Sequence, residues 1–126
     1  MKQLSFFFTI GLLLNSIFIA HAQNTKLLVE GSFATAITTT ASDLTLDETH
    51  QVVLVSSSTN RTITLPSATG TKGRKYTIKK IGTGDITVIP QSGQNIDNAG
   101  SFIIFGINSF LTIVSDGNNW WVVGRD

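Results

Sequence analysis

Beyond residue 22 the apolar residues come in short runs separated by glycine, serine and asparagine, and no segment shows the period of an amphipathic helix. His50–Ser56 is apolar on both faces, whereas Arg61–Leu65 alternates, with Ile63 and Leu65 on one face and threonines on the other. Such runs are typical of β-strands, and the abundance of threonine and other β-branched residues agrees. The sequence therefore predicts an all-β chain, folded as a compact antiparallel β-sandwich or β-roll of about seven to eight strands.

A weak repeat leaves a second architecture open. Ile63–Pro66 and Thr87–Pro90 end at prolines 24 positions apart, and Leu111–Val114 follows at about the same interval. A repeat of this length is typical of stacked β-coils, although hairpins of similar length give the same impression. The alternative to the sandwich is therefore a short β-solenoid-like stack.

The first 22 residues have the pattern of a secretory signal peptide. A positive residue, Lys2, precedes an apolar stretch that continues to Ile19, and the segment ends at the small-residue sequence Ala20–Ala22. The alternative is a retained membrane anchor, but the stretch is near the lower length limit for a bilayer and Asn15-Ser16 interrupts it. We expect cleavage after Ala22.

The remaining chain is expected to have two parts. Residues 23–40 form an amino-terminal arm or edge strand, and residues 41–126 form a single β-domain. The protein is then secreted, to the periplasm, the exterior or the cell surface, with no membrane insertion after signal cleavage.

Charge and cysteine content narrow the function. Loss of the signal peptide removes one cation, Lys2, and no acid, so eight Lys and Arg then balance eight Asp and Glu. A neutral chain has no general attraction for nucleic acid, and no nucleic-acid partner is expected. The absence of cysteine excludes disulfides, thiolate metal sites and a cysteine nucleophile. A domain of this size must then rely on its core, on bound ions or on self-association.

The sequence offers no recognisable catalytic set, so the chain is not expected to be an enzyme. His50 is the only histidine beyond the signal peptide, and no serine lies in a nucleophile-elbow motif. Asp85 and Asp116 lie beside glycines, where aspartate caps turns, and the acidic residues form no recognisable acid–base pair. Asp116–Asn119 reads as an Asp-Gly hairpin turn rather than a calcium loop. No metal and no cofactor is expected.

Three stretches taken in order carry a resemblance. Arg61–Pro66, Gly73–Lys80 and Val114–Val123 follow one another as in a small β-module of bacteriophage tail-fibre and tail-spike proteins, which the chain resembles from about Asp43 to Gly124. Similar modules occur in uncharacterised secreted bacterial proteins. The resemblance implies a structural or receptor-facing β-domain, often used in trimeric fibres, with no catalytic residues. Behind a signal peptide, it favours a host-encoded secreted protein.

The expected function is therefore that of a secreted, non-catalytic structural or adhesive β-module that self-associates as a homotrimer. The alternative is a carbohydrate-binding module. Trp120 and Trp121 must point to opposite faces of one strand, so one is expected in the core and the other at the surface or an interface. An exposed Trp121 beside Tyr76 or Phe105 would stack on a sugar ring of a cell-surface glycan, or contact a protein or a second subunit.

The remaining candidates lie on strands and turns. Lys75 and Lys79 share the outer face of their strand, where lysine discourages aggregation, while Lys80 falls on the face of Tyr76 and is expected at the rim. Structural roles are expected for five residues of the turns and the last strand: Pro66, Gly73, Asp116, Gly117 and Trp120.

Overall fold

The computed structural model describes residues 30–126. The chain divides after Ser32: residues 30–32 of the first unit form no strand, and the second unit, Phe33–Asp126, contains every described strand. The predicted signal peptide and residues 23–29 of the predicted arm lie outside the described residues. The second unit starts at Phe33 and includes the strand that begins at Ile37, whereas the sequence placed the start of the domain at residue 41.

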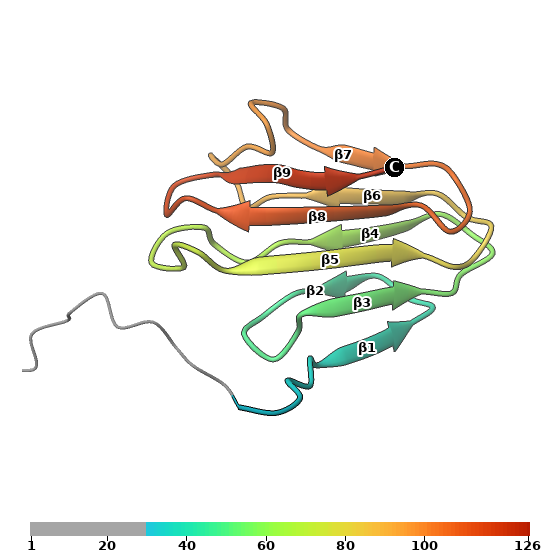
Figure 1. Ribbon diagram of the computed structural model, residues 1–126. Coiled ribbons are helices and arrows are strands. Elements are labelled where there is room, and N and C mark those ends of the chain that lie inside the picture. Colours follow the sequence, from blue (N-terminus) through green and yellow to red (C-terminus); the bar gives the residue numbers. More distant parts are fainter. Residues whose placement is uncertain (1–29) are drawn as a thin grey trace, which may run out of the picture. The chain divides into compact units, whose positions relative to one another are not determined.

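The unit Phe33–Asp126 is all-β, as predicted, and consists of two sheets (Figure 1). Its strands are β1 (Ile37–Thr40), β2 (Leu44–Thr45), β3 (Val52–Val55), β4 (Arg61–Thr64), β5 (Lys75–Lys80), β6 (Ile86–Ile89), β7 (Phe102–Ile104), β8 (Phe110–Ser115) and β9 (Trp120–Arg125). Sheet A has the order β1-β3-β5-β8-β9 and sheet B the order β2-β4-β6-β7. The described strands number nine rather than the seven to eight expected. Residues 30–126 contain no helix with the length and apolar character needed to span a membrane.

The antiparallel pairing that the sequence predicted is only partly present, because both sheets are mixed. β1, β3 and β5 pair in parallel in sheet A, and β2, β4 and β6 do so in sheet B. Each of β1 to β4 leads into the opposite sheet before the chain returns, so the next strand of its own sheet runs in the same direction. The result is three stacked coils, β1–β2, β3–β4 and β5–β6. This arrangement corresponds to the β-solenoid-like stack that the sequence left open as the alternative to a sandwich.

The repeat in the sequence corresponds to one pair of these coils. Ile63 in β4 pairs with Val88 in β6, and prolines follow both strands, at Pro66 and Pro90. The third match does not continue the stack, because Leu111 in β8 pairs antiparallel with β5. β7, β8 and β9 thus close the stack with antiparallel strands.

The core fills the space between the two sheets. Inward and outward positions alternate along β3, β5, β6 and β8, as the sequence predicted for β5. In β3, which is apolar on both faces, only Val53 and Val55 are fully buried. Truncating a buried residue such as Ile78, which is fully buried in β5, would cost about 2–5 kcal/mol. The buried apolar residues are Leu46, Val53, Val55, Ile63, Leu65, Ala68, Tyr76, Ile78, Ile86, Val88, Ile96, Ile104, Leu111, Ile113 and Trp120.

Successive coils also stack through their turns. The Gly82 N–H donates to the Val55 carbonyl and the Gly84 N–H to the Ser57 carbonyl, each at 3.0 Å. A Cβ atom at Gly82 or Gly84 would lie 2.1 Å from the carbonyl oxygen of Ser57 or of Thr59, respectively. Glycine is required here because the backbone of one turn lies directly against the backbone of the turn before it.

We expect Gly84→Ala to destabilise the protein by about 2–3 kcal/mol, because its methyl group must displace backbone rather than a flexible side chain. Urea denaturation measures the change. Gly100→Ala is the matched control, since no atom lies within 4 Å of its added Cβ. Equal midpoints for Gly84→Ala and the wild type would show that the turns are not in close contact.

Candidate functional site

The turn between β8 and β9 fixes the orientation of Trp121. The Asp116 Oδ1 atom accepts the N–H groups of Asn118 and Asn119, each at 2.8 Å, and its Oδ2 atom accepts the indole N–H of Trp121 at 2.6 Å. Gly117 takes the positive φ of 101° that the turn needs. The backbone N–H of Asn119, followed by the Trp121 indole, lowers the pKa of Asp116.

The same turn ties together loops that are distant in sequence. The buried Ser115 hydroxyl donates to the Ala68 carbonyl at 3.0 Å, and the Ser115 carbonyl accepts the Gly73 N–H at 2.8 Å. The Asn119 side-chain oxygen accepts the Asn95 N–H at 2.9 Å. The polar residues of this turn therefore hold the structure together at this end of the strands.

The two tryptophans have opposite environments. Trp120 is fully buried and lies against Tyr76, with ring centroids 5.6 Å apart. Trp121 is 38% exposed and pairs with Val114 on the outer face of sheet A. Tyr76 is 1% exposed, so it cannot form an open sugar platform with Trp121. The alternation along β5 places Tyr76 with Ile78 on the inner face, and so separates it from Trp121.

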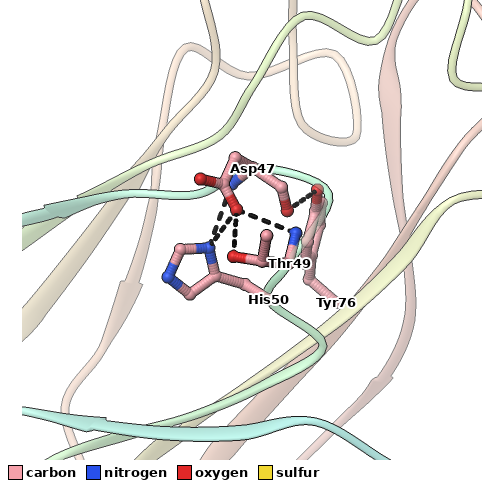
Figure 2. Close-up of polar contacts among 4 residues, drawn as sticks. All are labelled: Asp47, Thr49, His50 and Tyr76. Carbon is pink, nitrogen blue, oxygen red and sulfur yellow. Dashed lines mark hydrogen bonds and ion pairs between the residues drawn. The ribbon is translucent and has the colours of Figure 1, made fainter.

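Tyr76 instead anchors the turn that connects β2 to β3 (Figure 2). Its hydroxyl donates to the Asp47 carbonyl at 2.8 Å. The Asp47 side chain accepts the hydroxyl and the N–H of Thr49 at 2.6 and 2.8 Å, and lies 2.7 Å from Nδ1 of His50. The Thr49 bonds, with a smaller contribution from His50, lower the pKa of Asp47. His50 therefore sits in a turn-closing network around one carboxylate.

Exposed apolar side chains gather where β7 leads into β8. Ile103, Phe105 and Ile107 are 41%, 67% and 59% exposed, and we call this surface the β7–β8 corner. A pocket of about 450 Å³ opens beside it, and its size falls within the usual range for ligand sites. The pocket is lined by Phe102, Ile103, Ile104, Phe105, Gly106, Ser109, Phe110, Arg125 and Asp126.

A buried lysine holds the backbone of this corner in place. Lys80 lies on the inner face of β5 with Tyr76, and its side chain is 3% exposed. Its ammonium donates to Oδ1 of Asp85 at 3.0 Å and to the Phe105 carbonyl. Burying an ammonium group without such partners costs free energy, so the Lys80 bond to the Phe105 carbonyl is kept. This bond fixes the backbone at Phe105, while the residue stays exposed.

The two lysines of the outer face differ. Lys75 is exposed at the start of β5 and pairs with Val114. Lys79 is half-buried; its ammonium donates to the Asn108 carbonyl and lies 5.8 Å from the centroid of the Phe110 ring. Lys75 therefore lies in the same cross-strand row as Trp121, and Lys79 belongs to the β7–β8 end.

The sequence missed part of the corner. Phe102–Phe105 is apolar at every position, and the structure buries Ile104 but leaves Ile103 and Phe105 exposed. Arg125, whose guanidinium lies 5.8 Å from the Phe102 ring centroid, was also not singled out. The sequence does contain a signal for this exposed surface. All residues of β7 are apolar, and in a two-layer fold only one face of a strand is directed to the core.

Among residues 30–126 no group of three or more His, Asp or Glu side chains is arranged to hold a metal ion. No protein-family model matches the chain, and comparison with curated proteins found no relative.

We expect Asp116→Asn to reduce the loss of stability in acid. The pKa of Asp116 is lowered in the folded state, so its contribution is complete above the unfolded value of about 3.9 and is lost as the pH falls through the folded value. Melting temperatures measured from pH 7 to pH 2 should therefore fall less steeply below pH 4 in the variant. Some acid dependence remains, because Asp47 contributes with the same sign. Identical pH profiles would contradict this role of Asp116.

Proposed function

We propose that this chain is a secreted, non-catalytic structural or adhesive β-module, and that it self-associates as a homotrimer through the β7–β8 corner. The observation that carries the proposal is the 67% exposure of Phe105 on a backbone that the buried Lys80 holds in place. An exposed aromatic side chain on a fixed backbone loses less conformational freedom on binding than one on a mobile loop. Such side chains are typical of the residues that dominate interfaces.

The corner offers both halves of a contact. Phe105 protrudes beside a pocket with apolar walls, so the ring of one copy has a complementary cavity on the next. A contact between two different patches closes into a ring when the rotation between copies allows it. A threefold ring agrees with the resemblance to fibre modules. Association would also add stability to a protein that has no disulfides.

The charged groups support a role without catalysis. The carboxylates of Asp47, Asp97 and Asp116 accept backbone N–H groups of nearby residues, and Asp85 pairs with the buried Lys80. Each of these groups already has a structural function.

We expect Phe105→Ser to lower threefold the mass of the chain from Gln23 to Asp126, measured by size-exclusion chromatography with light scattering. Removing the ring takes away the apolar anchor of the contact while leaving the Lys80 bond to the backbone intact. Val123→Ser is the control, since Val123 is similarly exposed but lies on β9. A folded wild-type monomer would contradict self-association, and a trimer of Phe105→Ser would contradict the role of the corner.

The alternative is glycan binding through Trp121, and one observation favours it. The bond from the indole to Asp116 holds the ring in one orientation while 38% of the residue stays exposed. Lys75 lies two strands away in the same row, at about 10 Å, and can reach the polar groups of a sugar stacked on the ring.

If this alternative holds, Trp121→Ala should abolish binding to a glycan that the wild type retains on an array, and Val123→Ala should not. Tryptophan fluorescence titration measures the affinity. Equal affinity of Trp121→Ala and the wild type would exclude this site, as would the failure of folded wild type to bind any glycan.

A further inference from the structure

The edge of sheet A at β1 has unused hydrogen-bonding groups. The carbonyls of Ala36 and Thr40 accept the N–H groups of Val52 and Ser56, so these β1 residues face β3. Successive residues of a strand direct their N–H and C=O groups to opposite sides, and those of Ile37 and Thr39 therefore point away from the sheet. Within the described part of the chain no strand lies on that side of β1.

The opposite edge of sheet A is covered. The Trp120 N–H donates to the Asn95 carbonyl at 2.9 Å, and the Asp97 N–H donates back to the Trp120 carbonyl at 3.0 Å. Oδ1 of Asp97 also accepts the Val122 N–H at 2.8 Å. A loop thus satisfies edge groups of Trp120 and Val122, in the first half of β9. Among residues 30–126 no loop covers β1 in this way, and β1 has no charge, proline or bulge, which are the usual devices against edge pairing.

Apolar side chains are exposed at the same edge. Ile37 in β1 is 64% exposed, and Phe33, which precedes the strand, is 70% exposed. Ile37 pairs with Val52 on the outer face of sheet A, so these two apolar side chains form the end of a cross-strand row that continues with Thr77. A strand added beside β1 would extend the row and cover Ile37.

We propose that β1 pairs antiparallel with β1 of a second copy about a twofold axis, which makes the two copies of sheet A continuous. In the register that fits, Ile37 lies opposite Thr39 of the second copy and the reverse pair follows by symmetry. Each pair exchanges two backbone bonds, because both residues direct their N–H and C=O groups to the free edge. Ile37 then lies on the same face as Ile37 of the second copy.

A second copy fits this edge better than a foreign peptide for two reasons. β1 is uncharged, so identical strands meet without repulsion, and a twofold contact uses the same patch on both partners. In addition, β1 and β2 lie at the same end of the two sheets (Figure 1). An axis that crosses both sheets turns the β2 edges toward each other as well, whereas one peptide strand would cover a single edge.

This twofold contact goes beyond the proposed function and uses a different surface from the β7–β8 corner. A threefold ring triples the number of copies, and a contact at β1 doubles it. Where both form and the twofold axes lie perpendicular to the threefold axis, the closed assembly contains six copies. The two proposals therefore differ in the factor by which a variant changes the mass.

The test is Thr39→Pro in the chain from Gln23 to Asp126, measured by light scattering over a concentration series. Proline removes an N–H that points off the edge, and edge strands tolerate it, so the bonds from β1 to β3 remain. We expect this variant to halve the mass. Thr39→Val, which keeps the N–H and nearly the same volume, should not change it. Ile37→Lys should halve the mass independently, by placing like charges at the contact.

Amide hydrogen exchange gives a second readout. In the assembled wild type the amides of Ile37 and Thr39 should be protected, and in Ile37→Lys the Thr39 amide should exchange freely. A mass that Thr39→Pro and Ile37→Lys leave unchanged overturns this proposal, whatever the effect of Phe105→Ser. Protection of the two amides in a monomer also overturns it, because another segment of the same chain would then occupy the edge. A threefold loss confined to Phe105→Ser supports the proposed function alone.

Discussion

The structure depends on the burial of one face of each strand against the opposite sheet. Val53 and Ile78 on β3 and β5 face Ile63 and Val88 on β4 and β6, and all four are fully buried. Because the chain changes sheet after each of the first five strands, the two sheets are interleaved along the chain and each coil contributes one strand to each of them. Apolar burial is the main force that holds such layers together, and here it also stacks the coils.

Backbone contacts between successive coils determine how closely the coils stack. Gly82 and Gly84 let one turn lie against the turn before it, and the carboxylates of Asp47 and Asp116 close turns by accepting backbone N–H groups. Charged side chains are therefore used to satisfy the backbone where the strands end. The buried Lys80 does the same for the Phe105 carbonyl and so connects the core to the surface of the β7–β8 corner.

The two ends of the stack are different. At one end a loop through Asn95 and Asp97 covers the start of β9, and exposed apolar groups lie on the β7–β8 corner. At the other end no strand within residues 30–126 pairs with the free side of β1. A chain of this size without disulfides has few ways to gain stability, and both surfaces give it a way to do so through other copies.

By itself the sequence determined the β-strands, their inward and outward faces, the Asp-Gly turn and the opposite environments of Trp120 and Trp121. These follow from alternation and turn chemistry, which act over a few residues. Only the tertiary structure decided that β4 pairs in parallel with β6, that Tyr76 lies with Trp120 instead of Trp121, and that Phe105 remains exposed. Strand partners and the Lys80 bond to Phe105 join residues that are far apart in the chain, and no local pattern specifies which distant groups meet.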